Sequence, residues 1–347
     1  MIPVASCERF YKEAVMAESV LRSVAAEAAT MPELGEALSA QLQRHVPHDG
    51  YILAGLDPAS GIGCLIARRN CYSPAARYRL EVDGGGADPH RWDDLFAGGC
   101  PVAVKGSGFT DESRDGFLHG LMAEEGFGAE LCLALVERGV PRGGLLLLRE
   151  RGRQPFQETE ADAAARLAGE LAASVRCFVA GRLLRPPVPA APPGVVLVGP
   201  DHRIRAATPA GRDWLRVLQR ETAVGDDELD SMMLPVALAA QGRPTVTRVP
   251  TSVGWVVVDG QSVDGTGDVA VTIGLAGGAT LLPAVAGWYR ITARERAVVE
   301  QALLGLPVKQ IARRLDLSPH TVNDYFRTIY RKTYVTSREE LVSALSV

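Results

Sequence analysis

The first half of the chain combines helix-like and strand-like patterns of apolar residues. Stretches rich in alanine, glutamate and leucine predict helices over 7–30, 33–44 and 158–184. Short apolar runs bounded by turn residues predict strands over 51–57, 63–69, 129–137 and 143–150. A Gly139–Gly144 turn joins the last two, which predicts a hairpin whose apolar arms lie centrally in a sheet. The stretch 82–108 contains three consecutive glycines and is expected to be a loop with short pieces of structure.

The helix predicted over 158–184 carries a narrow apolar stripe. Its members step along the helix at intervals of four and three, and they are Leu167, Leu171, Val175 and Phe178. Such a stripe suits pairing between helices. We therefore expect this helix, together with the helix over 7–30, to contribute to a dimer.

A proline-rich segment separates this half from a second block. Residues 185–193 hold five prolines, which predicts a linker. After it, the pattern predicts a hairpin that turns at Pro200-Asp201, a helix over 209–220, a polar stretch, strands over 253–263 and 267–276, and a short helix over 280–288.

Local signals divide residues 291–347 into four helices. Thr292 and Glu295 form a capping box that starts the first helix, and Gly305 ends it. The second helix is predicted over 307–315, and residues 316–318 form a tight turn. Ser318 is a favourable N-cap that starts a third helix, which extends to about residue 332.

The third helix is expected to bury one face and to expose the other. Its buried residues should be Val322, Phe326, Ile329 and Tyr330. A second capping box, Ser337 with Glu340, starts a short fourth helix that should bury Leu341, Val342 and Leu345. A tight turn between two helices, the second with polar and basic residues on its outward face, predicts a helix-turn-helix.

Charge is unevenly distributed along the chain. Residues 288–347 carry ten Lys and Arg against six Asp and Glu, which is a net charge of +4. Because the whole chain has a net charge of −4, residues 1–287 carry −8. A small basic module on a larger acidic body is the pattern expected when a single module contacts phosphate.

Other residue types exclude several classes of protein. The six cysteines and six histidines form no ligand pattern, so the cysteines are interpreted as small buried apolar residues, with a redox-sensing or metal-binding thiol as the alternative. His45 and His48 lie in a turn. No stretch of about 18 apolar residues is present, and residues 1–10 do not resemble a secretory leader, so we expect a cytoplasmic protein without membrane contact.

The first two blocks resemble known sensor families. Residues 30–184, in the order helix, strands, hairpin and long helix, resemble a GAF domain, and residues 194–277 resemble a PAS domain. The resemblance implies antiparallel sheets flanked by helices, a layout that commonly encloses a small-molecule pocket. A photoadduct flavin site in the PAS-like block is excluded because it contains no cysteine. A haem there would have only His202 as an axial histidine, and Trp214 and Trp255 are expected in the core.

The last block closely resembles the LuxR/FixJ-type DNA-binding domain. Six motifs carry the resemblance at fixed spacings: T-x-R-E (292–295), G-L (305–306), K-x-I-A-x-x-L (309–315), L-S-x-x-T-V (317–322), I-x-x-K (329–332) and S-R-x-E-L (337–341). The chain departs from the family pattern at Pro307, Asn323 and Tyr325. The whole chain is thus expected to be multidomain: an α+β GAF-like domain (1–184), the linker (185–193), an α+β PAS-like domain (194–279), a connecting helix (280–290) and an all-α four-helix LuxR-type domain (291–347).

The resemblance also implies which residues contact DNA. The third helix would enter the major groove, where Asn323, Asp324 and Arg327 would face base edges. The side chains expected to contact phosphate are Lys309, Ser318, His320, Thr321, Arg331 and Lys332.

These observations favour a cytoplasmic bacterial transcription regulator that is a homodimer and binds double-stranded DNA. Its sensor domains would bind a small molecule or mediate dimerisation, and we expect no cofactor. The alternative is a ligand-binding scaffold whose helix-turn-helix is a surface for a protein partner. An enzyme is not expected, because no phosphate-binding loop or nucleophile motif is evident in residues 1–347.

Overall fold

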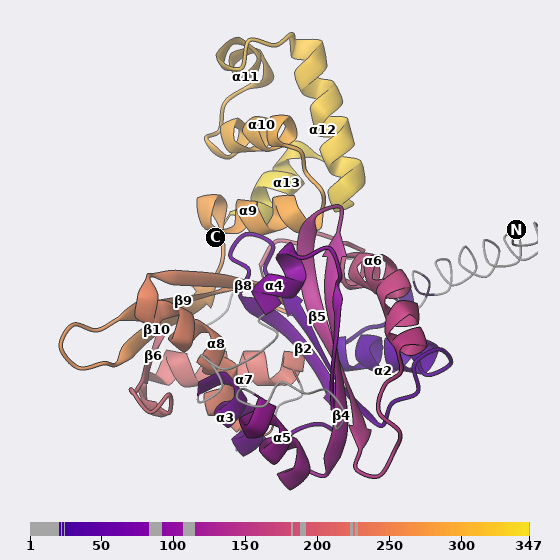
Figure 1. The fold of residues 1–347 in the computed structure, drawn as a ribbon. Coiled ribbons are helices and arrows are strands. Elements are labelled where there is room, and N and C mark those ends of the chain that lie inside the picture. The colour runs from indigo at the N-terminus through magenta and orange to yellow at the C-terminus, as the bar shows by residue number, and fades with distance from the viewer. Residues whose placement is uncertain are drawn as a thin grey trace, which may run out of the picture. The chain divides into compact units, whose positions relative to one another are not determined.

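The computed structural model contains two compact units (Figure 1). It describes residues 21, 23, 25–82, 92–106, 115–181, 183–187, 192–222, 225 and 228–346. Unit 1 comprises Met1–Gly55 and Leu65–Phe178, and unit 2 comprises Leu56–Cys64 and Val179–Val347. Most of the helix predicted over 7–30, and residues 188–191 of the predicted linker, lie outside the described residues. The finer division into domains stays a prediction.

The first unit is built on a five-stranded antiparallel sheet in the order β2-β1-β5-β4-β3. Its strands are β1 (Gly50–Leu56), β2 (Gly63–Arg69), β3 (Val102–Gly106), β4 (Phe127–Glu137) and β5 (Val140–Glu150). The predicted β4–β5 hairpin is confirmed, and β5 lies at the centre of the sheet. Gly143 allows the close approach of β1, because a Cβ there would lie 2.1 Å from the carbonyl oxygen of Ala54.

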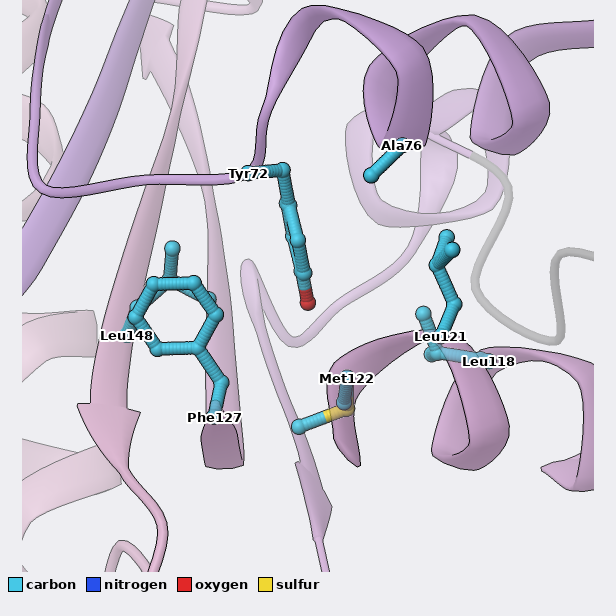
Figure 2. Close-up of a cluster of buried hydrophobic side chains, with 7 residues drawn as sticks. All are labelled: Tyr72, Ala76, Leu118, Leu121, Met122, Phe127 and Leu148. Atoms are coloured by element: carbon cyan, nitrogen blue, oxygen red, sulfur yellow. The ribbon is translucent and has the colours of Figure 1, made fainter. Parts of the chain in front are cut away.

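Helices cover both faces of this sheet. They are α2 (Met31–Leu42), α3 (Pro74–Val82), α4 (Trp92–Ala97), α5 (Asp115–Glu124) and α6 (Glu158–Ala180). On one face, side chains of α3 and α5 pack with Phe127 and Leu148 of the sheet. Figure 2 shows the Tyr72 ring between Phe127 and the leucines of α5, and the two rings meet edge to face at 5.4 Å. Because side chains alternate across a strand, Leu145 and Leu147 face the other side, along which α2 and α6 lie (Figure 1).

Three of the four members of the stripe on α6 are buried within the single chain, and Leu167 is half-buried. Leu171 and Val175 are fully buried and Phe178 is 5% exposed. Ser174, on the same helix, donates a hydrogen bond to the carbonyl of Leu21. A second copy of the folded chain therefore has no access to these side chains, and the expected use of the stripe for dimerisation is not supported by its burial.

The second unit contains another five-stranded antiparallel sheet, in the order β7-β6-β10-β9-β8. Its strands are β6 (Gly194–Val198), β7 (Ile204–Ala207), β8 (Thr245–Thr251), β9 (Gly254–Ser262) and β10 (Val269–Leu275), and its helices are α7 (Pro209–Thr222), α8 (Leu229–Gly242) and α9 (Gly278–Trp288). The hairpin at Pro200-Asp201 and the β9–β10 pair are confirmed. Trp214 is 1% exposed and Trp255 is 7% exposed, so both lie in the core as expected.

The prediction of a polar stretch without regular structure after α7 is partly wrong. The structure forms α8 and β8 there, and α8 contains Pro235 in its interior. Proline removes one helix hydrogen bond and normally ends a helix. Here the helix continues past it because Leu234, Val236 and Ala237 are buried where α8 packs against β9.

Four helices complete the described chain: α10 (Ala293–Leu303), α11 (Val308–Arg314), α12 (Pro319–Thr333) and α13 (Arg338–Leu345). The capping box at Thr292 and Glu295 is present with both of its hydrogen bonds. In the second box the Ser337 hydroxyl accepts from the Glu340 N–H, while the short hydrogen bond to the Glu340 carboxylate comes from the Thr336 N–H, at 2.6 Å. Two antiparallel-sheet modules and one helical module confirm the predicted multidomain fold class.

The cysteines are less uniform than expected. Among those that the structure describes, Cys64 and Cys132 are buried, Cys71 and Cys177 are half-buried, and Cys100 is exposed; all five are free thiols. The interpretation as buried apolar residues therefore holds for Cys64 and Cys132 and is wrong for Cys100.

Candidate nucleic-acid interface

The turn between α11 and α12 sets the direction of the third helix of the C-terminal module. Asp316 adopts a left-handed backbone conformation with φ +52°, which Asp tolerates better than most residues. The Ser318 hydroxyl then accepts a hydrogen bond from the backbone N–H of Thr321 at 3.0 Å. This N-cap and Pro319 in the first turn start α12 as predicted.

One face of α12 anchors the helix in the core of the module. Val322, Phe326 and Ile329 are between 0% and 4% exposed, which confirms their predicted burial. They lie on one side of the helix because they are three or four residues apart. Tyr330 is only half-buried and stacks on Phe326, with ring centroids 5.8 Å apart. The opposite face is thereby directed outward.

The outward face of α12 forms a continuous polar stripe. Its exposed members recur every three or four residues and are His320, Asn323, Asp324, Arg327 and Arg331. The side chains of Asp324 and Arg327 are 50% and 73% exposed, so both are accessible to a ligand the size of a duplex. The structure thus places all three predicted base-contacting residues on one accessible surface, which we call the α12 stripe.

The predicted phosphate-contacting residues divide into three groups. Lys309 on α11, and His320 and Arg331 on α12, are exposed. Ser318 and Thr321 form the N-cap of α12, where their hydroxyls lie 2.9 Å apart. A helix N-terminus presents backbone N–H groups that favour an anion, so a phosphate there would also meet these two residues.

Lys332 differs from the other predicted phosphate contacts. Its ammonium donates to both carboxylate oxygens of Glu295, at 2.6 and 2.9 Å, and to the carbonyl of Arg290 at 2.7 Å. The Lys332 side chain is 24% exposed and that of Glu295 is 5% exposed. Burial by itself raises the pKa of the Glu295 carboxyl, but hydrogen bonds from Lys332 and Thr292 outweigh it and leave the pKa lowered. Lys332 therefore connects α12 to the start of α10.

Sequence reasoning missed this pair and the cations of α11. Arg313 and Arg314 are exposed, and Arg314 also hydrogen-bonds to Gln301 at 3.1 Å. The signal for the Glu295–Lys332 pair was present, because both residues belong to the quoted motifs. Their proximity depends on how α10 and α12 pack.

A buried polar cluster lies in unit 1, on the sheet face that α3 and α5 cover. Glu130 of β4 is 4% exposed and accepts from the Tyr72 hydroxyl at 2.7 Å and from the Cys132 thiol at 3.2 Å. The Lys105 ammonium lies 3.7 Å from the same carboxylate. Burial and the neighbouring carboxylate raise the pKa of Tyr72 far above its usual value, so its hydroxyl remains a donor. Sequence analysis did not predict this cluster.

The described residues contain no helix with both the length and the apolar character of a membrane span. Nor do their His, Cys, Asp and Glu side chains gather in a group of three that could hold a metal ion. His45 lies in the turn that follows α2, as predicted, whereas His48 lies in the loop between that turn and β1; His202 lies in the bend between β6 and β7, with φ +57°.

Comparison with known proteins identifies the class of the C-terminal module. Helices α11 and α12, their tight turn and the outward stripe define a helix-turn-helix. Residues 290–345 match the family described as bacterial regulatory proteins of the LuxR family. These residues are therefore a LuxR-family helix-turn-helix domain, as the motifs predicted.

The individual similarities cover different parts of the chain. A monoamine regulon transcriptional regulator from Klebsiella aerogenes is 45% identical over 62 residues, which are 18% of this chain and 25% of that protein. Among solved structures, the alignment with Escherichia coli SdiA covers 96% of this chain and 96% of SdiA, at 13% identity and a TM-score of 0.38. The alignment with the GAF domain of the cyanobacteriochrome TePixJ covers 44% of this chain and 94% of the TePixJ chain, at 16% identity and a TM-score of 0.31. The match that identifies a family is thus confined to the C-terminal domain.

Proposed function

We propose that the protein is a cytoplasmic transcription regulator that binds double-stranded DNA as a homodimer, with the α12 stripe in the major groove. The observation that carries the proposal is the stripe itself, a solvent-exposed helix face whose residues include Asn323 and Arg327. Asparagine pairs with adenine and arginine with guanine through two hydrogen bonds each. The net +4 of residues 288–347 supports contact with phosphate.

The upstream modules supply the regulatory input in this proposal, without enzymatic activity or a cofactor. They bind a small molecule or mediate dimerisation, and so control the helix-turn-helix. The first role rests on the resemblance of residues 30–184 and 194–277 to sensor domains that commonly enclose a small-molecule pocket. The resemblance to the LuxR-type domain implies a dimer contact through the last helix, here α13, on which Val342 is half-buried and Ser343 is exposed.

Two variants of the full chain test DNA recognition. A preferred duplex is first selected with the wild-type protein from a random pool, and binding is then measured on that duplex and on a random one across a salt series. Arg327→Ala should weaken binding to the preferred duplex by about 1–3 kcal/mol per protomer and relax its sequence preference. Lys309→Ala should weaken both duplexes alike and lower the salt slope by about one per protomer.

The outcomes separate this function from the scaffold alternative. A wild-type protein that selects no duplex and whose binding to random DNA is undetectable would support a helix-turn-helix that serves as a protein-partner surface. If Arg327→Ala weakened both duplexes equally, α12 would be docked with another face toward the bases.

A further inference from the structure

The centre of the α12 stripe holds a carboxylate between two basic side chains. Asp324 is the only acidic residue of α12. One of its oxygens lies 2.9 Å from a terminal nitrogen of Arg327, and the other lies 3.4 Å from Nε2 of His320. All three side chains are at least half exposed, so the array faces the solvent that DNA would replace.

We propose that Asp324 is a specificity-determining residue that orients Arg327 and prevents the stripe from binding phosphate indiscriminately. This inference rests on the proposed function, because it concerns how the same surface selects its DNA. The favoured target is a G·C base pair. Its major-groove edge presents the guanine O6 and N7 acceptors to Arg327 and the cytosine amino donor to Asp324.

The hydrogen-bonding capacity of arginine makes this arrangement compatible with base recognition. A guanidinium has five N–H donors in a planar fork, and the contact with Asp324 uses one nitrogen of Arg327. The remaining donors are sufficient for a bidentate contact with guanine. Asp324 therefore holds the side chain of Arg327 along the helix face without preventing it from reaching a base.

The same carboxylate disfavours a contact with the DNA backbone. It offsets the positive charge of Arg327 and repels a phosphate that approaches the middle of the stripe. A cytosine amino group can donate a hydrogen bond to the Asp324 carboxylate in place of His320 or water. A phosphate oxygen has no hydrogen to donate and therefore cannot. Binding to random sequence is thus penalised, while binding to the matching base pair is retained.

Folding does not explain the array. Exposed ion pairs on a helix surface contribute little to stability. Removing the charge of Asp324 should consequently leave the thermal unfolding of the protein unchanged, which separates a role in specificity from a structural one.

The test compares Asp324→Asn with Asp316→Asn in the full chain. Both variants remove one negative charge from the same domain, but Asp316 lies in the turn before α12, where Asn also tolerates the left-handed conformation. Dissociation constants are measured on the selected duplex and on a random duplex of equal length, across a salt series, and thermal unfolding is followed in parallel. Asp324→Asn should tighten binding to the random duplex roughly 3- to 10-fold and reduce the preference for the selected duplex about 10-fold, whereas Asp316→Asn should leave that preference unchanged.

Three results would overturn the inference. Equal effects of the two variants would show that net charge alone matters, and an unchanged preference in Asp324→Asn would show that the carboxylate does not select. A lowered unfolding temperature of Asp324→Asn would indicate a structural residue. A wild-type protein that binds no duplex would instead refute the proposed function, and this inference with it.

Discussion

At the scale of single residues, the buried imidazole of His48 shows how an isolated histidine becomes structural. His48 is 2% exposed, its Nδ1 lies 2.7 Å from the Val46 carbonyl and its Nε2 lies 2.8 Å from the Ser39 hydroxyl. A carbonyl can only accept, so Nδ1 carries the proton and Nε2 accepts from Ser39. Burial lowers the pKa of His48, and the hydrogen bond to Val46 opposes this only in part. The ring therefore fixes the turn between α2 and β1 in its neutral form.

This arrangement predicts a loss of stability in mild acid. Because the pKa of His48 is lower in the folded state, the unfolded chain binds more protons in mild acid. The stabilisation that the neutral ring provides is therefore fully present above about pH 6.5 and is lost as the pH falls from there through the folded-state pKa of His48. In urea unfolding of the full chain, His48→Gln should cost about 1–3 kcal/mol near pH 8 and reduce the acid dependence. The exposed His45, changed to Gln, is the matched control and should keep both the stability and the acid dependence of the wild type. An acid dependence that His48→Gln does not alter would contradict this assignment.

At the scale of elements, the Glu295–Lys332 pair determines how α12 is attached to the rest of its domain. The pair joins the capping box of α10 to the last turn of α12, and it is largely buried. Removing one partner of a buried pair leaves an uncompensated charge, which costs more than the loss of an exposed pair. We expect Lys332→Met, which keeps the apolar stem, to lower the unfolding free energy of the C-terminal domain by about 2–3 kcal/mol.

The control for this prediction is the other lysine of the domain. Lys309→Met removes the same charge at an exposed position and should leave the unfolding transition unchanged while lowering the salt slope of DNA binding. Calorimetric unfolding and binding across a salt series measure both quantities. If Lys332→Met lowered the salt slope without changing the unfolding transition, Lys332 would be the phosphate contact that the family resemblance implies.

At the scale of the whole molecule, the proposed dimer makes a prediction about DNA geometry. Two copies of α12 related by symmetry read half-sites about one helical turn apart. Inserting five base pairs between the selected half-sites turns one of them to the opposite side of the duplex. Affinity should then fall to that of a single half-site, a loss of at least about 100-fold, because the two contacts no longer reinforce each other. Inserting five base pairs outside the two half-sites lengthens the duplex without changing their spacing and is the control; equal affinities for all three duplexes would indicate independent monomers.

Local sequence signals predicted the C-terminal domain almost completely. Thr292, Gly305 and Ser318 begin or end helices through hydrogen bonds to residues within one turn, so neighbouring residues are sufficient to place those boundaries. The burial of Val322 and Phe326 follows from the helical period. The exposed side of α12 is then determined as well, because it is the helix face opposite the buried residues.

The upstream modules were predicted less fully, because several of their elements depend on distant partners. The hairpins of strongly apolar strands were predicted, but α3, α5, α8 and β8 were not. Helix α8 retains Pro235 because the neighbouring residues are buried against a sheet, and local propensity is a weak prior against such burial. The stripe of Leu171 and Val175 had the spacing of a dimer contact, but its own chain covers it.

In the candidate interface, too, some features follow from local sequence and others depend on contacts between distant residues. The sequence by itself determined which residue types lie on α12 and at what spacing, because helix geometry converts spacing into a face. Only the tertiary structure decided that the Lys332 ammonium lies against Glu295, 37 residues away in sequence, where its side chain is only 24% exposed. The physical reason is that a charge is satisfied by whichever group the packing brings within hydrogen-bond distance, and packing depends on contacts far apart in the chain.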